Sequence, residues 1–123
     1  MGNEKILIVE AEALCANDIR HKLNDLGYPI TDVARTSKEA IRKTEEIHPD
    51  LVLVDMILQG KMNGFKIAEK IQSKYEVPII YLTDNFDQST HIDSLESKPF
   101  GFLIKPVNDH ELSSAVETAL FTR

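Results

Sequence analysis

Short apolar runs alternate with longer amphipathic stretches along this chain. Four runs are apolar at successive positions and rich in β-branched residues: residues 6–9, 51–54, 77–82 and 102–104. A strand that is apolar on both faces must be covered on both faces, as in a parallel sheet between layers of helices. A fifth run, residues 30–34, follows the turn signal Gly27-Tyr28-Pro29 and alternates more, so we expect it at an edge of the sheet.

Between these runs the apolar residues take helical spacing. The stripes that we assign to four helices are Leu14, Ile19, Leu23 and Leu26; Ala40, Ile41, Thr44 and Ile47; Phe65, Ile67, Ala68 and Ile71; and Leu112, Ala115, Val116, Ala119 and Leu120. Thr36 with Glu39, and Asn108 with Glu111, have the spacing of capping boxes at helix starts. Residues 88–95 are a weaker helical candidate.

Strands that alternate with helices predict an α/β fold, a (βα)₅ doubly wound five-stranded parallel sheet with right-handed crossovers. We assign the strand order 2-1-3-4-5, which places a ligand crevice at the carboxyl ends of the first and third strands. The chain shows no repeat, low-complexity stretch or linker. We therefore expect residues 1–123 to form one domain, with an ordered core over about residues 4–121.

Polar side chains follow four of the predicted strands directly. They are Glu10, Asp55, the pair Thr83-Asp84, and Lys105. Two carboxylates suit a hard cation such as Mg²⁺, and an ammonium and a hydroxyl beside that cation suit a phosphoryl group. A carboxylate placed there could accept that group as an aspartyl phosphate.

Each of these residues alone has an ordinary structural explanation. An acid after a strand is often a solvated strand end or a helix cap, a lysine is most often a surface residue, and Thr83 alone is more often a cap. Their coincidence at neighbouring strand ends favours a functional site. We read the four histidines as solvated and Cys15 as a small packing residue.

Composition narrows the function classes. The 123 residues carry a formal net charge of −6, which argues against nucleic acid or an anionic membrane as the direct partner. The single cysteine excludes an internal disulfide and fits a reducing, cytoplasmic compartment. No apolar run is long enough to span a bilayer, and the acidic N-terminus does not resemble a signal peptide.

The chain resembles the receiver (response-regulator) domains of two-component signal transduction, which are CheY-like and have a flavodoxin-like fold. The resemblance covers residues 5–120. The stretches that carry it are Lys5-Ile6-Leu7-Ile8-Val9-Glu10, Pro49-Asp50-Leu51-Val52-Leu53-Val54-Asp55, Met62-Asn63-Gly64, Pro78-Ile79-Ile80-Tyr81-Leu82-Thr83 and Gly101-Phe102-Leu103-Ile104-Lys105-Pro106. Five such stretches in this order and spacing are a specific signature.

The resemblance implies a phosphoacceptor switch rather than an enzyme. Asp55 would take a phosphoryl group from the phosphohistidine of a sensor histidine kinase. Mg²⁺ would be held by Glu10, Asp55 and the main-chain carbonyl of Ile57. Lys105 would pair with the phosphoryl oxygens, and Thr83 would hydrogen-bond the same group. Such a phosphate adds a charge of roughly −1.5 to −2, enough to shift a local equilibrium.

The resemblance also implies an output surface. Phe102 occupies the position of the family's aromatic switch, whose rotamer follows the threonine. Phosphorylation would remodel the surface of the fourth helix, fifth strand and fifth helix, near Ile92, Leu95, Phe102 and Leu112. An output domain, a downstream protein or a second copy in a homodimer would read it. We expect no direct contact with nucleic acid or membrane.

Three departures from the family pattern leave alternatives open. Ala11 stands where the family has a second metal-binding acid, so the chain could be a degenerate receiver that binds proteins without phosphorylation. Asp84 follows Thr83 where a small residue is usual, and we expect it to face solvent or cap a helix. Ile57 is apolar where the family varies, and it stands where aspartyl-phosphate hydrolases need a second acid. This argues against a phosphatase, and the lack of a phosphate-cradling loop argues against a flavodoxin-type cofactor binder.

Overall fold

The strands of this chain form a single parallel sheet. The computed structural model describes residues 3–58, 64–84 and 101–121. Its strands are β1 (Lys5–Val9), β2 (Ile30–Ala34), β3 (Leu51–Asp55), β4 (Ile79–Thr83) and β5 (Gly101–Ile104), and they pair in the order β2-β1-β3-β4-β5. The predicted α/β fold and strand order 2-1-3-4-5 are confirmed, with residues 30–34 at an edge. The run predicted at residues 77–82 forms β4, which begins two residues later than expected, at Ile79, and ends at Thr83.

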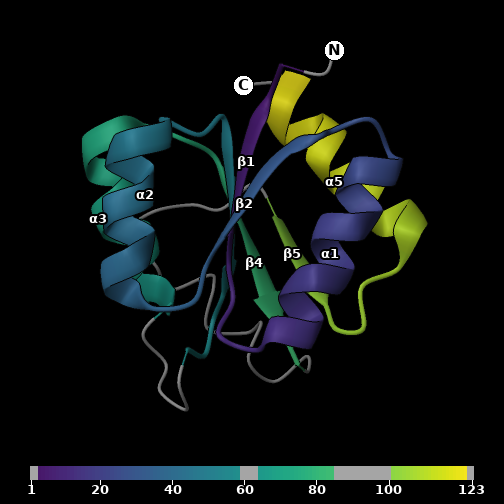
Figure 1. Cartoon of the computed structure of the whole chain (residues 1–123), viewed down its shortest axis with the longest axis horizontal. Helices are drawn as coiled ribbons and strands as arrows, with labels where there is room; N and C mark the ends of the chain where they lie inside the picture. The colour runs from purple at the N-terminus through teal and green to yellow at the C-terminus, as the bar shows by residue number, and fades with distance from the viewer. Residues whose placement is uncertain (1–2, 59–63, 85–100, 122–123) are drawn as a thin grey trace.

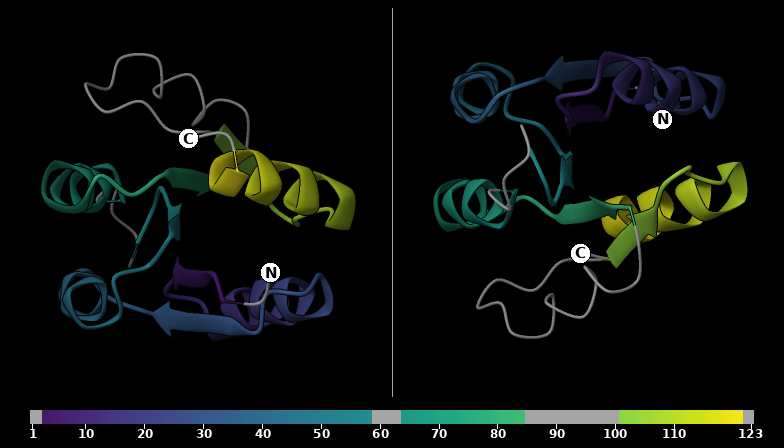
Figure 2. Two further views of the ribbon diagram at one scale, coloured as in Figure 1. Left: turned by 90° about the horizontal axis from the view of Figure 1, so that it is seen from above. Right: turned by 90° about the horizontal axis from the view of Figure 1, so that it is seen from below.

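Helices cover both faces of the sheet. They are α1 (Ala13–Asp25), α2 (Ser37–Ile47), α3 (Gly64–Tyr75) and α5 (Asp109–Phe121). Figures 1 and 2 show α1 and α5 on one face and α2 and α3 on the other. The helix expected within residues 88–95 lies outside the described residues. None of the helices that the structure describes is long and apolar enough to cross a membrane.

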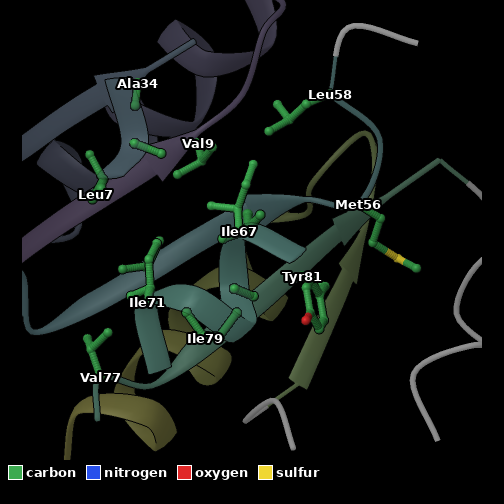
Figure 3. Close-up of a cluster of buried hydrophobic side chains, with 14 residues drawn as sticks. Leu7, Val9, Ala34, Met56, Leu58, Ile67, Ile71, Val77, Ile79 and Tyr81 are labelled. Carbon is green, nitrogen blue, oxygen red and sulfur yellow. The ribbon is translucent and has the colours of Figure 1, made fainter. Parts of the chain in front are cut away.

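Successive strand residues point to opposite faces and build two cores. The α2/α3 core contains Leu7, Val9, Ala34, Ala40, Val52, Val54, Met56, Leu58, Ile67, Ala68, Ile71, Val77, Ile79 and Tyr81. The α1/α5 core contains Ile6, Ile8, Ile19, Leu23, Tyr28, Leu51, Leu53, Ile80, Leu82, Leu103, Val107, Leu112, Val116 and Ala119. Figure 3 shows the α2/α3 core between the sheet and α3. Burial of one such aliphatic side chain contributes about 1.5–3 kcal/mol, so the sheet is fixed from both sides.

The predicted helix starts are confirmed, with one change of partner. The Thr36 hydroxyl accepts the N–H of Glu39 at 3.1 Å, and the Asn108 side chain accepts the N–H of Glu111 at 3.1 Å. In a complete capping box the Glu39 carboxylate would accept the N–H of Thr36. It accepts the N–H of Arg35 at 3.4 Å instead.

The predicted inner face of the first helix is partly wrong. Ile19 and Leu23 are buried as expected, but Leu14 is 81% exposed and Leu26 lies after the helix. The buried stripe begins at Ala16, three residues before Ile19. Leu14 stands two positions before Ala16, which turns it toward the opposite side of the helix.

Gly64 opens α3 against the backbone of β3. Its N–H donates to the carbonyl of Met56 at 3.1 Å. A Cβ atom at residue 64 would lie 2.1 Å from the main-chain oxygen of Asp55 and 2.9 Å from the Cα atom of Met56. These neighbours are backbone atoms that cannot rotate away. Glycine is therefore required for α3 to start this close to the end of β3.

We expect Gly64→Ala to destabilise the fold by about 2 kcal/mol or more, because the new methyl group overlaps backbone. Gly101→Ala is the matched control, since a Cβ there meets nothing within 4 Å. Urea unfolding followed by circular dichroism measures both free energies. Equal stability of the two variants would contradict the close approach at Gly64.

Candidate functional site

The polar strand ends predicted from the sequence meet at one edge of the sheet. Glu10 directly follows β1, Asp55 and Thr83 are the last residues of β3 and β4, and Lys105 directly follows β5. These four strands are neighbours, and their carboxyl ends lie at the lower edge of the sheet in Figure 1. The register holds this arrangement, because Asp55 pairs with Leu82 and Thr83 pairs with Ile104. The main-chain N–H of Lys105 also donates to the carbonyl of Thr83 at 2.8 Å.

Lys105 joins the two buried carboxylates. Its Nζ lies 2.8 Å from Oε1 of Glu10 and 2.8 Å from Oδ2 of Asp55. The Glu10 side chain is 2% exposed and that of Asp55 8%. Two carboxylates buried this deeply need a cation beside them, since the cost of removing their charges from water is large. The ammonium of Lys105 supplies that cation.

Loop amides hold the remaining oxygens of the two carboxylates. The N–H of Ile57 donates to Oδ1 of Asp55 at 3.0 Å, and the N–H of Glu12 donates to Oε2 of Glu10 at 3.2 Å. Each carboxylate is therefore fixed at one oxygen by Lys105 and at the other by the backbone two residues further along. This orients both groups toward the same point.

Burial and mutual repulsion shape the titration of the pair. Burial, and then the hydrogen bond with Glu10, raise the pKa of Asp55 to about 6. Burial alone would raise the pKa of Glu10 too, but its hydrogen bonds with Asp55 and Lys105 outweigh this and lower it. Burial would lower the pKa of Lys105, yet its two carboxylate partners hold it well above its usual range. The first proton taken up by the pair therefore goes to Asp55.

Comparison with known proteins identifies the family of this chain. The family model of the response regulator receiver domain matches residues 6–117. The chain belongs to that family. It is similar to the transcriptional regulatory protein PdtaR of Mycobacterium tuberculosis, with 32% identity over 94% of this chain and 56% of that protein. It is also similar to the "Probable transcriptional regulator ycf27" of Porphyridium aerugineum, with 30% identity over 98% of this chain and 49% of that protein.

A solved structure extends the comparison to three dimensions. The signal receiver domain of a modulated diguanylate cyclase from Desulfovibrio desulfuricans G20 is 34% identical to this chain. It superposes with a TM-score of 0.85 over 96% of this chain and 94% of that one. The chain spans about half the length of the curated relatives that it matches. Its similarity to them is therefore the similarity of a receiver domain within longer regulators.

The other predicted site residues of this receiver domain differ in how far they are buried. Thr83 is fully buried at its strand end. Phe102 is 41% exposed on β5, where it pairs with Tyr81. Asp84 is 63% exposed, as expected, with a carboxylate oxygen 3.5 Å from Lys105. Leu112 does not belong to the predicted output surface, because it is fully buried in the α1/α5 core.

Some predicted positions have no described structure. Ile92 and Leu95 of the proposed output surface, and the loop at residues 59–63, lie outside the described residues. The described part of that surface is a groove of about 350 Å³ between β5 and α5. Its lining residues are Phe102, Leu103, His110, Glu111, Ser114, Ala115 and Thr118.

Three residues that were not predicted to belong to the site support it. Cys15 packs against the α1/α5 core and hydrogen-bonds Glu10, and burial followed by this bond raises the pKa of its thiol to about 12. Lys22 of α1 donates to the carbonyl of Val107 at 2.6 Å, in the loop that follows Lys105. Arg35 donates to the carbonyl of Ala11, beside Glu10. No sequence signal marks these contacts, because each joins segments that are distant in the chain or depends on a helix phase.

Replacing the Asp55 carboxylate by its neutral isostere should stabilise the protein at neutral pH. The folded-state pKa of Asp55, about 6, lies above its ordinary value of 3.8, so stability from this group is complete below about pH 4 and is lost as the pH rises through 6. Asp55→Asn removes that loss. We expect a gain of about 1–3 kcal/mol at pH 7.5 and almost none at pH 4.

Urea unfolding at the two pH values, in the absence of divalent cations, measures this gain. Asp25→Asn is the matched control, because the same change at this exposed acid at the end of α1 should alter stability by less than about 0.5 kcal/mol. A loss of stability in Asp55→Asn at pH 7.5 would show that its ion pair with Lys105 outweighs the cost of burial.

Proposed function

We propose that this receiver domain accepts a phosphoryl group on Asp55 from the phosphohistidine of a sensor histidine kinase. The observation that supports this best is the buried Asp55 carboxylate, held at the end of β3 by Lys105 and the N–H of Ile57. In the transfer, a carboxylate oxygen of Asp55 bonds to phosphorus as the phosphorus–nitrogen bond breaks, and the histidine nitrogen keeps the electron pair. The products are an aspartyl phosphate and a free histidine.

Lys105 and Thr83 would stabilise the transferred group. The ammonium of Lys105 already contacts Oδ2 of Asp55 at 2.8 Å, so a phosphoryl group attached to Asp55 brings its oxygens within reach of the same cation. Thr83 stands on the neighbouring strand end. Its hydroxyl is the group that we assign as a second donor to the phosphoryl oxygens. An ammonium and a hydrogen-bond donor on two sides would stabilise the negative charge of the phosphoryl oxygens.

The donor set fits a weakly held Mg²⁺. Glu10, Asp55 and the main-chain carbonyl of Ile57 offer oxygen atoms, which this ion prefers, and Mg²⁺ is commonly held by one or two carboxylates together with water and phosphate. Within residues 3–58, 64–84 and 101–121, no group of three acidic, histidine or cysteine side chains could hold a metal. The ion would supply additional positive charge beside the phosphoryl group. Two carboxylates shared with Lys105 predict low affinity before phosphorylation.

Incubation with Mg²⁺ and acetyl phosphate tests the acceptor. We expect one phosphoryl adduct on the wild-type protein by intact-mass measurement, and none on Asp55→Asn, which lacks the nucleophilic carboxylate. Asp25→Asn, at an exposed acid that ends α1 away from the site, is the matched control and should be labelled as the wild type is. Labelling of Asp55→Asn at the wild-type level would place the acceptor elsewhere.

A second function has one observation in its favour. The Ala11 side chain, at the position of the family's second acid, packs against the α2/α3 core. A receiver domain in which this position packs against the core, instead of binding a metal, could bind proteins without phosphorylation. The same experiment separates the two functions. Labelling of Ala11→Asp but not of the wild type would favour the phosphorylation-independent module.

Ile57 should prolong the phosphorylated state. Its half-buried apolar side chain lies two residues after Asp55 and cannot orient an attacking water by hydrogen bonding. We expect the adduct on Ile57→Asn to decay several-fold faster than that on the wild type after removal of acetyl phosphate. Ile57→Val keeps the apolar side chain and should decay at the wild-type rate. Equal decay of all three proteins would exclude this role.

The output would pass through the β5 and α5 surface, with Phe102 as its switch residue. Phe102 lines the groove between β5 and α5 and is exposed enough to change its packing when Thr83 engages the phosphoryl group. An output domain, a downstream protein or a second copy of the domain would bind there. We further propose that residues 1–123 act as one receiver domain in the cytoplasm, because a chain with a single cysteine fits a reducing compartment.

A further inference from the structure

Arg35 holds the loop that carries Glu10 from outside the site. It directly follows β2, and its guanidinium donates from Nε and Nη2 to the main-chain carbonyl of Ala11 at 3.0 and 2.8 Å. The N–H of Arg35 donates to the carboxylate of Glu39 in the first turn of α2 at 3.4 Å. The arginine therefore connects the β1–α1 loop to the start of α2.

The loop that it holds is the one that orients Glu10. The N–H of Glu10 donates to the carbonyl of Ala34 at 2.9 Å, which extends the pairing of β1 with β2 by one residue. The chain then turns at Ala11, so that the N–H of Glu12 reaches back to Oε2 of Glu10 at 3.2 Å. Glu12 is the N-cap of α1 and makes no capping hydrogen bond with its side chain. The turn that leads into α1 is therefore not stabilised by the side-chain capping hydrogen bond that is usual at a helix start.

We propose that Arg35 is a positioning residue, which fixes the turn at Ala11 and thereby orients the Glu10 carboxylate toward Asp55 and a divalent cation. The part that concerns the cation rests on the proposed function. Two effects of the guanidinium oppose each other. Its positive charge repels a cation, but the side chain is exposed, so solvent and salt screen that repulsion. Its paired hydrogen bonds act directly on the main chain beside Glu10, and this ordering dominates.

Arg35→Ala and Arg35→Lys separate geometry from charge. Arg35→Lys keeps the positive charge but loses the forked pair of donors. Arg42→Ala is the matched control, because Arg42 is an exposed arginine of α2 whose ion pair with Glu46, at 3.3 Å, lies away from the site. Hydrogen exchange of the Glu12 amide, measured by NMR without metal, reports the turn itself. Calorimetric titration with Mg²⁺ reports its consequence.

For Arg35→Ala we expect exchange of the Glu12 amide to accelerate about three- to tenfold, and the dissociation constant for Mg²⁺ to rise by a similar factor, as for the loss of a typical hydrogen bond at an exposed side chain. Arg35→Lys should lie between Arg35→Ala and the wild type, and Arg42→Ala should match the wild type in both measurements. Unchanged exchange in Arg35→Ala would overturn the proposal. So would tighter Mg²⁺ binding, which would make Arg35 a source of repulsion alone.

The two proposals fail in different ways. If the wild type neither binds Mg²⁺ nor accepts a phosphoryl group, the proposed function fails. The exchange rate of the Glu12 amide then still decides whether Arg35 fixes the turn beside Glu10. If the wild type is phosphorylated but Arg35→Ala exchanges at the wild-type rate, the positioning role fails and the proposed function remains.

Discussion

The ammonium of Lys105 between two buried carboxylates is the interaction on which the site depends. Glu10 and Asp55 come from different strands, and without a shared cation their charges would repel each other in a region that excludes water. The sheet order makes the contact possible, because it places the ends of β1, β3, β4 and β5 in one row. The two cores hold these strands in register from opposite faces. The site is thus a product of the whole sheet.

Contacts with main-chain groups hold the site in place in addition to Lys105. Gly64 lets α3 start against the end of β3, where any side chain would overlap the backbone of Asp55. Lys22 and Arg35 donate to carbonyls in the loops that carry Lys105 and Glu10. The loops that carry Glu10 and Lys105 are therefore each held by a basic side chain from a neighbouring element. Their geometry does not depend on the charged groups of the site alone.

The sequence predicted the sheet and the row of polar strand ends because both follow from local rules. Runs that are apolar at every position predict buried strands, and parallel strands bring their ends together. The burial of Leu14 was predicted wrongly, because it stands five residues before Ile19 and so lies outside the spacing of three or four that joins Ala16, Ile19 and Leu23 on one face. The contacts of Cys15, Lys22 and Arg35 with the site could not be predicted. They depend on the distance between loops and helices, which only the packed structure sets.

Ala11 changes the charge balance of the site. The charges of Glu10, Asp55 and Lys105 sum to −1, and the exposed Asp84 carboxylate beside Lys105 adds one more negative charge. An acid at position 11 would add a further one. Without that additional charge the site attracts a divalent cation less strongly. The proposed phosphoryl group on Asp55 would add roughly −1.5 to −2, so the demand for the cation would arise mainly on phosphorylation. With Ala11 in place, we expect the cation and the phosphoryl group to stabilise each other's binding, and the resting domain to rely on Lys105.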